Sequence, residues 1–176
     1  MYYKDVEHNK WIDENWITIG RALYYKRAYE KSLKNFQFVK RLFVKDPSFY
    51  VAQLWMAKIH IEQRSYADAK LTLDELNGIS KAQRKKTFKD YIPFVNKKPT
   101  DEEILPEMSK SLQFDIYKAY ADLAIKRNEY PEAIMGLKSA ILKCPTSKEK
   151  TRLNFILGQL YQQSNQLDSA AYYFSK

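Results

Sequence analysis

A pattern of small and bulky positions occurs four times along the chain. Each copy opens on a small residue, and these residues lie 37, 64 and 37 positions apart: Gly20, Ala57, Ala121 and Gly158. A second small residue follows twelve positions later in every copy: Ser32, Ala69, Ala133 and Ala170. Bulky residues follow nine and sixteen positions after the first small residue: Tyr29 and Phe36, Tyr66 and Leu73, Tyr130 and Leu137, Leu167 and Phe174. Small residues let two helices approach closely, and a single hairpin cannot bury its bulky face alone. The pattern therefore predicts an all-α stack of helical hairpins.

The pattern also predicts where the helices begin and end. We expect four pairs joined by short polar turns: residues 13–26 with 29–45, 48–63 with 66–77, 107–127 with 130–143, and 147–163 with 166–176. Pro47 and Pro131 suit the first turn of a helix, where no backbone donor is lost. Thr146 and Glu149 have the spacing of a capping box.

The wide second spacing predicts an insertion between pairs two and three. The expected organisation is a lead-in at 1–12, two repeats at 13–77, a basic insertion at 78–106 that contains three prolines, and two repeats at 107–176, of which the last is truncated. Within the insertion we expect a short helix near 81–91 and then an irregular loop. Solenoids usually carry polar terminal caps. The absence of such caps predicts that the chain is a piece of a longer array.

The register resembles the tetratricopeptide repeat (TPR). The residues that match lie in the first, third and fourth copies: Trp16, Ile19, Gly20, Tyr29 and Phe36; Ala121, Tyr130, Ala133, Ala140 and Pro145; Leu157, Gly158, Tyr161, Ala170 and Phe174. The second copy departs from the repeat at Gln53, where Trp is usual, and at His60, where Tyr is usual. The resemblance implies a TPR-like solenoid of about four helix pairs that binds other proteins and is not an enzyme.

Residues 11–76 are also similar to the repeat region of the SprE/PorW family, a TPR lipoprotein of the type IX secretion and gliding machinery. The similarity rests on Trp11-Ile12-Asp13, Ile19-Gly20-Arg21-Ala22, Tyr24-Tyr25-Lys26-Arg27 and Trp55-Met56-Ala57, followed by Tyr66 and Leu73. It implies type IX secretion components as partners and a place on the periplasmic side of the outer membrane. The family attaches its lipid to an N-terminal cysteine that this sequence does not show. Membrane contact would therefore come only through an anchor outside this chain.

Composition and charge leave one alternative function open. The chain has 45% hydrophobic residues, one cysteine and a net charge of +9, which is compatible with a folded protein of the cytoplasm or the periplasm. Five basic residues of the insertion form a cluster interleaved with Phe88 and Tyr91: Lys81, Arg84, Lys85, Lys86 and Lys89. Basic and aromatic side chains together suit anionic lipid or nucleic acid. A solvated surface that meets an acidic protein is the interpretation we favour over nucleic acid.

Residues for catalysis, metal binding or cofactor binding are sparse. His8 and His60 are the only histidines, and Cys144 is the only cysteine. Zinc sites need closely spaced ligands, and a nucleophile needs a base within hydrogen-bond reach. The acidic run Asp101-Glu102-Glu103 suits a helix start. We therefore predict no catalytic residue, no metal site and no cofactor, and we expect His60 to pack inside its repeat.

The first helix of each pair predicts the partner-binding groove, because these helices line the concave face of TPR stacks. The expected groove residues are Ile17, Arg21, Tyr24, Tyr25, Leu54, Lys58, Ile61, Glu62, Lys118, Asp122, Ile125, Arg152, Phe155, Gln159 and Gln162. Mixed apolar and charged side chains suit a bound helix or extended peptide. Some of these residues could instead pack within the solenoid. Arg21, Tyr24, Tyr25 and Lys58 are the expected hot spots, because Tyr and Arg are enriched in such positions.

Overall fold

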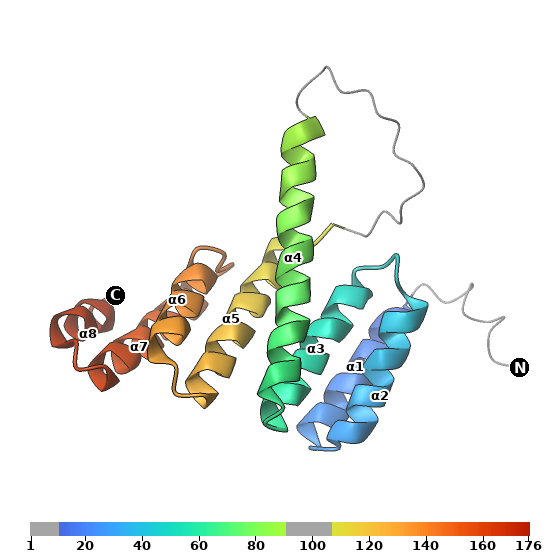
Figure 1. Cartoon of the computed structure of the whole chain (residues 1–176), viewed down its shortest axis with the longest axis horizontal. Helices are drawn as coiled ribbons and strands as arrows, with labels where there is room; N and C mark the ends of the chain where they lie inside the picture. Colours follow the sequence, from blue (N-terminus) through green and yellow to red (C-terminus); the bar gives the residue numbers. More distant parts are fainter. Residues whose placement is uncertain (1–10, 91–106) are drawn as a thin grey trace, which may run out of the picture. The chain divides into compact units, whose positions relative to one another are not determined.

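The computed structural model describes residues 11–90 and 107–176, and for residues 79–90 it describes the backbone alone. The described residues form helices and contain no strand, which confirms the all-α prediction (Figure 1). In chain order the helices are α1 (Ile12–Tyr25), α2 (Tyr29–Leu42), α3 (Ser48–Glu62), α4 (Tyr66–Asp90), α5 (Lys110–Lys126), α6 (Tyr130–Ile141), α7 (Ser147–Gln163) and α8 (Leu167–Phe174). Consecutive helices form packed hairpins, as the repeated register predicts.

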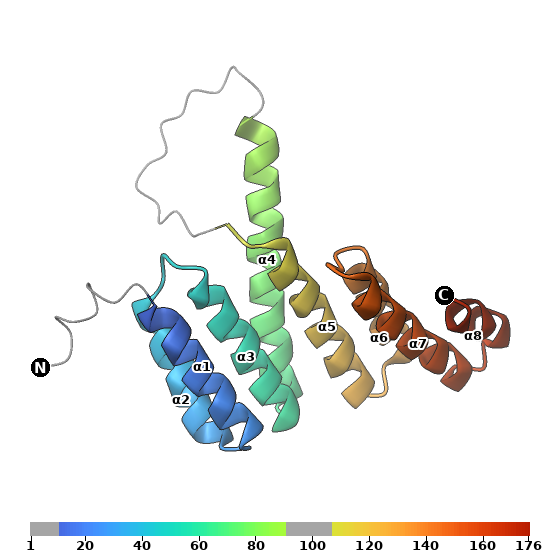
Figure 2. The same ribbon diagram turned by 180° about the vertical axis from the view of Figure 1, so that it is seen from behind.

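The chain divides into two compact units, residues 1–108 and residues 109–176. We call them the N-terminal and C-terminal units. In the N-terminal unit α3 packs against α1, α2 and α4, so the first helices of two successive hairpins are neighbours (Figure 2). In the C-terminal unit α6 packs against both α5 and α7, and α7 pairs with α8. Each unit thus holds two hairpins of the repeat.

The small residues of the repeated register are buried, as the sequence predicts. Ala57, Ala69 and Ala133 have no exposed surface, and Ser32 has none either. The Ser32 hydroxyl donates a 2.8 Å hydrogen bond to the Gly20 carbonyl, which joins α1 to α2. Close backbone approach at these positions leaves room for the bulky residues to fill the space between helices.

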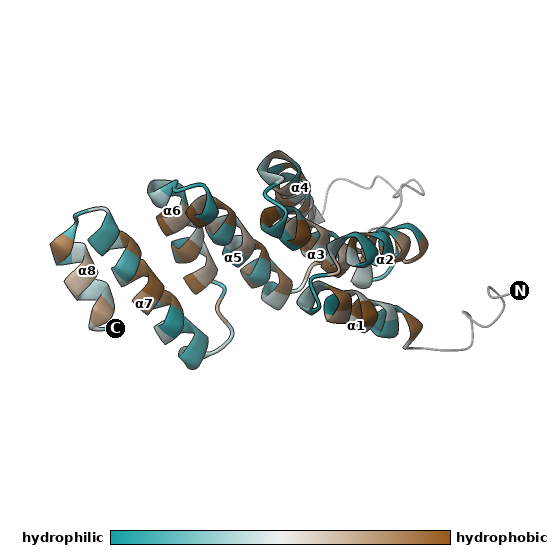
Figure 3. Ribbon diagram, turned by 90° about the horizontal axis from the view of Figure 1, so that it is seen from below, coloured by the Kyte–Doolittle hydropathy of each residue, from teal (hydrophilic) through white to brown (hydrophobic). Residues whose placement is uncertain are grey.

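Helix α3 is the buried centre of the N-terminal unit. Its buried side chains lie on two opposite sides of the helix and include Tyr50, Leu54, Ile59 and Ile61. Helices α1, α2 and α4 pack against α3, so a helix with two apolar sides is covered on both. Helix α1 and helix α7 of the C-terminal unit carry both polar and apolar positions (Figure 3).

The turn inside each hairpin has the same geometry in all four copies. The second residue after the first helix has a positive φ of 57° to 61°: Arg27, Arg64, Asn128 and Asn165. The next backbone N–H reaches back five residues, as Ala28 does to the Leu23 carbonyl. This is the Schellman motif, which usually has Gly or Asn at the left-handed position. Arginine at two of these positions is unfavourable, because a left-handed conformation costs a side-chain-bearing residue about 1–2 kcal/mol.

Replacing Arg64 with glycine is therefore expected to raise the free energy of unfolding by about 0.5–1 kcal/mol, after allowance for the greater freedom of glycine in the unfolded chain. The matched control is Gln63→Gly, one residue earlier, where φ is −79° and glycine brings no relief. This control should be destabilised. Urea denaturation measures both, and a loss of stability in Arg64→Gly would contradict the repeated turn geometry.

Helix α4 corrects one sequence prediction. The second helix of this hairpin was predicted to end near residue 77, before a separate short helix at 81–91, and this is wrong because α4 runs without a break to Asp90. Gly78 is its only glycine, and one glycine costs a helix about 1 kcal/mol without ending it. The first proline after it is Pro93. The predicted loop with Pro93, Pro99 and Pro106 lies at residues 91–106, outside the described residues, as do His8 and Asp101-Glu102-Glu103.

Two helix starts show how capping sets the boundaries. Thr146 accepts a 3.2 Å hydrogen bond from the Glu149 backbone N–H, and its hydroxyl donates to the Glu149 carboxylate at 3.0 Å. The predicted cap is thus confirmed. Helix α5 begins at Lys110 and not at the predicted 107, because the Ser109 hydroxyl accepts a 3.1 Å hydrogen bond from the Leu112 N–H.

None of the helices described is both long enough and apolar enough to cross a membrane.

Candidate functional site

Four side chains of α1 and α3 gather around one indole ring of α3 in the N-terminal unit. We call Arg21, Tyr24, Tyr25, Trp55 and Lys58 the Trp55 cluster. Arg21 lies one turn before the adjacent Tyr24 and Tyr25 on α1, and Trp55 and Lys58 lie three residues apart on α3. Residues three and four apart share a helix face, and α1 packs directly against α3. The repeat register therefore brings these side chains together.

The aromatic part of the cluster is held by edge-to-face contacts. The Trp55 ring lies 5.2 Å from the Tyr24 ring and 6.0 Å from the Tyr25 ring, both edge-on. Phe36 of α2 stacks on Trp55 with ring centroids 6.1 Å apart. These distances and angles are those that aromatic pairs prefer. Trp55 is only 8% exposed, so it links the hydrophobic core to the surface side chains above it.

Two cations lie against this same indole. The Arg21 guanidinium carbon is 5.3 Å from the centroid of the Trp55 ring, and the Lys58 ammonium is 4.3 Å from it. Both distances fall within the range of cation–π attraction, for which tryptophan is the strongest partner. The ring thus places two positive charges, one from each helix, at a defined position on the unit.

The two tyrosines of the cluster have different roles. Tyr24 is half-buried and packs against the core, with its ring also 5.7 Å from Tyr29. Tyr25 is 68% exposed. Arg21 is exposed and Lys58 is half-exposed. Tyr25 and the two cations therefore form the outer surface of the cluster, while Tyr24 and Trp55 support it from below.

Three predicted groove residues of this unit are buried. Ile17, Leu54 and Ile61 are 8%, 2% and 1% exposed, so they pack inside the protein and offer no open contact surface. Ile17 belongs to the core that contains Phe36, and Leu54 and Ile61 are among the buried residues of α3. The prediction that they line the groove is corrected accordingly. Glu62 is exposed at the end of α3, four residues after Lys58.

The other predicted groove residues belong to the C-terminal unit. Lys118 lies 4.9 Å above the Phe114 ring and forms a 3.6 Å ion pair with Asp115. Phe155 is 55% exposed and packs 5.5 Å from the Phe174 ring. The remaining predicted members include exposed polar side chains: Asp122, Arg152, Gln159 and Gln162. Of these residues, Lys118 already pairs its ammonium with the Asp115 carboxylate of the same helix.

A second cation–aromatic arrangement in the C-terminal unit escaped the sequence analysis. The Lys138 ammonium of α6 lies 5.5 Å from the Tyr161 ring and 6.0 Å from the Tyr173 ring, which stack on each other. A hydrogen bond with Tyr161 raises the pKa of Lys138 above its ordinary value of 10.5. A raised folded-state pKa favours folding at neutral pH and loses its effect only as pH rises through the raised value. Through these two rings, Lys138 connects α6 to α7 and α8.

Trp55 is the member of the Trp55 cluster that the groove prediction omitted. In the sequence, Trp55 drew notice only through the family resemblance, although Trp55 and Lys58 have the spacing of one helix face. The candidate chemical residues occupy ordinary positions: His60 is half-buried in α3, as expected, and the Cys144 thiol donates to the Thr146 carbonyl at 3.2 Å. The basic residues Lys81, Arg84, Lys85, Lys86 and Lys89 lie in the last turns of α4, whose side chains are outside the described part.

The fold is similar to two solved structures of MamA. "MamA 41-end from Desulfovibrio magneticus RS-1" has 15% sequence identity and a TM-score of 0.60, with 96% of this chain and 75% of that chain covered. The "MamA RS-1 ArsTM double mutant" has 15% identity and a TM-score of 0.59 over the same shares. No family model and no curated protein sequence matches the chain. These likenesses show a TPR-like helical fold.

Proposed function

We propose that this chain is a non-enzymatic protein-binding scaffold and that the Trp55 cluster is its contact surface. The observation that carries the proposal is an exposed tyrosine beside two cations, all held on one indole at the junction of two first helices. Binding hot spots are enriched in Trp, Tyr and Arg, and they need a rigid support. The TPR-like stack provides that support.

A finer proposal concerns the assembly in which the scaffold works. On the resemblance of residues 11–76 to the SprE/PorW family, we propose partners among the type IX secretion and gliding components and a place on the periplasmic side of the outer membrane. The sequence resemblance alone supports this assignment. Cell fractionation followed by co-purification with type IX components tests it, and recovery of the chain from the cytoplasm without them would contradict it.

The contact surface predicts the effect of removing Tyr25. Because Tyr25 is 68% exposed, Tyr25→Ala should leave the melting temperature near that of the parent. It should weaken partner binding by about 1–1.5 kcal/mol, or roughly fivefold to tenfold, as an interface tyrosine does. Quantitative pull-down from the producing cells, with the chain as bait, measures this loss.

The matched control is Tyr172→Ala in α8, where the parent tyrosine is 55% exposed. Partner recovery should be unchanged in this control. Equal recovery by the parent and Tyr25→Ala would refute the proposed surface. Lys85→Ala with Lys86→Ala supplies the other comparison: if this pair abolishes binding while Tyr25→Ala has no effect, the basic stretch of α4 is the site, and anionic lipid or nucleic acid becomes the ligand to test.

A further inference from the structure

We propose that the Trp55 cluster selects acidic protein segments, in which a carboxylate lies between Arg21 and Lys58 and a neighbouring apolar side chain packs on Tyr25. This inference rests on the proposed function and names the chemistry of its partner. It follows from the placement of two positive charges around one ring and from the distribution of charged residues along the same two helices and the turns that follow them.

The first step concerns the two cations. Arg21 and Lys58 come from different helices, yet both lie against the Trp55 ring, at 5.3 Å and 4.3 Å. The negative face of the indole attracts each cation, but like charges near each other remain mutually unfavourable. Arg21 forms no salt bridge with any residue that the structure describes. A carboxylate from outside the chain could form an ion pair with the Arg21 guanidinium.

The second step concerns the ends of the surface. Helices α1 and α3 run in the same direction, because α2 leads the chain back between them (Figure 2). Glu14 is exposed in the first turn of α1, and Glu62 is exposed in the last turn of α3. Lys26, Arg27 and Arg64 are also exposed, in the turns that follow α1 and α3. The end of the surface that carries the Trp55 cluster is therefore positive overall. Such a charge distribution favours acidic partners over basic ones.

The third step concerns the apolar contact. A surface that used charge alone would discriminate poorly between acidic partners, because salt screens exposed charges. Tyr25 adds a broad aromatic face next to the cations, and its ring is braced edge-on by Tyr24 at 5.4 Å. A segment with an apolar residue beside its carboxylate can use both features together. The net charge of +9 on the chain also favours encounter with acidic partners.

The test uses two short fluorescein-labelled peptides. In the first, two aspartates flank a phenylalanine in a glycine-serine background; in its twin, asparagines replace the aspartates. Fluorescence anisotropy with the whole chain should show binding of the acidic peptide, weakened by added salt, and binding of the twin at least about tenfold weaker. Arg21→Gln and Lys58→Gln should each weaken the acidic peptide about fivefold to tenfold and leave the twin unaffected.

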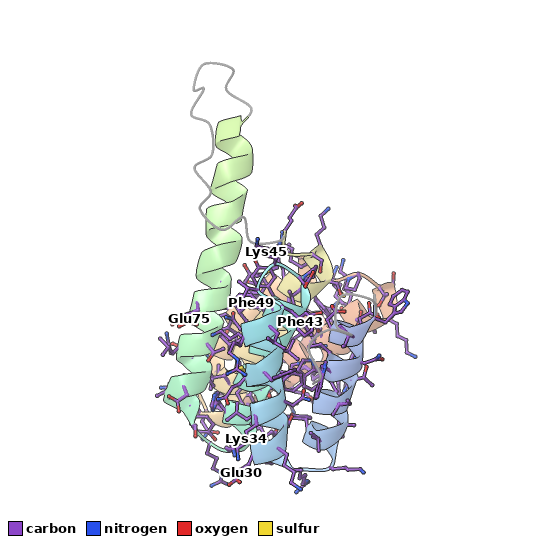
Figure 4. All side chains as sticks on the ribbon, turned by 90° about the vertical axis from the view of Figure 1, so that its right-hand side faces the viewer. Glu30, Lys34, Phe43, Lys45, Phe49 and Glu75 are labelled. Atoms are coloured by element: carbon purple, nitrogen blue, oxygen red, sulfur yellow. The ribbon has the colours of Figure 1, made fainter. Side chains whose placement is uncertain are left out.

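The matched control is Lys34→Gln, an exposed lysine on α2 that lies near Glu30 (Figure 4). It removes one charge from the same unit and should leave peptide affinity unchanged. Equal binding of the two peptides would overturn the inference, as would a loss in Lys34→Gln equal to that in Arg21→Gln. Loss of acidic-peptide binding in Lys85→Gln with Lys86→Gln, but in neither cluster variant, would overturn it as well.

Failure of this inference is distinguishable from failure of the proposed function. If capture of the natural partner depends on Tyr25 but is indifferent to Arg21→Gln and Lys58→Gln, the scaffold stands and the acidic preference is wrong. If capture is indifferent to Tyr25 as well, the proposed surface itself is wrong. If both dependences appear together with the peptide preference, the partner segment is acidic.

Discussion

Replacing Gly20 with alanine is expected to lower the free energy of unfolding by about 1–3 kcal/mol, although alanine is intrinsically the better helix former. A Cβ at this position would stand 2.6 Å from the Asn35 side-chain oxygen and 2.6 Å from the Phe36 ring. Phe36 has no exposed surface, so its ring has nowhere to move. The methyl group would force α1 away from α2. Urea denaturation measures the loss.

The other glycines supply graded controls. Gly78 lies in α4 with no neighbouring atom within 4 Å of the added methyl, so Gly78→Ala should raise the free energy of unfolding by about 0.5–1 kcal/mol. Gly158→Ala meets the Phe174 ring at 2.5 Å, but this ring is 43% exposed at the chain end and can turn away at lower cost. If Gly20→Ala were as stabilising as Gly78→Ala, the close contact between α1 and α2 would be wrong.

The helix pairs could be predicted from the sequence because their packing requirement is local and repeated. A small residue such as Gly20 has a fixed partner twelve positions later, and the two must meet for the hairpin to close. The buried pair Gly20 and Ser32, with its hydrogen bond across the hairpin, shows this requirement met. Four copies of the same constraint located seven of the eight described helices to within a few residues.

The length of α4 could not be predicted in this way. Its apolar pattern is clear through Leu73 and Leu76, both fully buried, and it ends there. Beyond that point no packing pattern requires a helix, so the sequence analysis ended it near 77. A helix nevertheless continues until a residue interrupts it, and Gly78 does not. Burial marks where a helix packs, which is a different property from where it stops.

The candidate site was predictable in its location and not in its detail. The register placed Arg21, Tyr25 and Lys58 on neighbouring first helices, and the structure brings them to one ring. Which of two adjacent tyrosines faces outward depends on a rotation of about 100° per helical residue. That rotation is fixed by the contact of Tyr24 with Trp55, which the sequence alone did not reveal.

Replacing Trp55 with alanine should have the largest effect on the N-terminal unit. Trp55 is 8% exposed and contacts Phe36, Tyr24 and Tyr25, so its removal leaves a cavity where three rings meet. Truncation of a buried tryptophan costs about 3–5 kcal/mol. We expect a loss of this size in urea denaturation. Phe155→Ala, at a 55% exposed aromatic residue, is the control and should lose far less.

Two conservative variants separate packing by Trp55 from its electrostatic role. Trp55→Phe keeps an aromatic face for Arg21 and Lys58, whereas Trp55→Leu keeps only apolar bulk. Both should lose less stability than Trp55→Ala, because both fill part of the cavity. Trp55→Leu should weaken the acidic peptide more than Trp55→Phe, since only a ring attracts the two cations. Equal affinities in Trp55→Leu and Trp55→Phe would show that the indole merely fills space and does not position the charges.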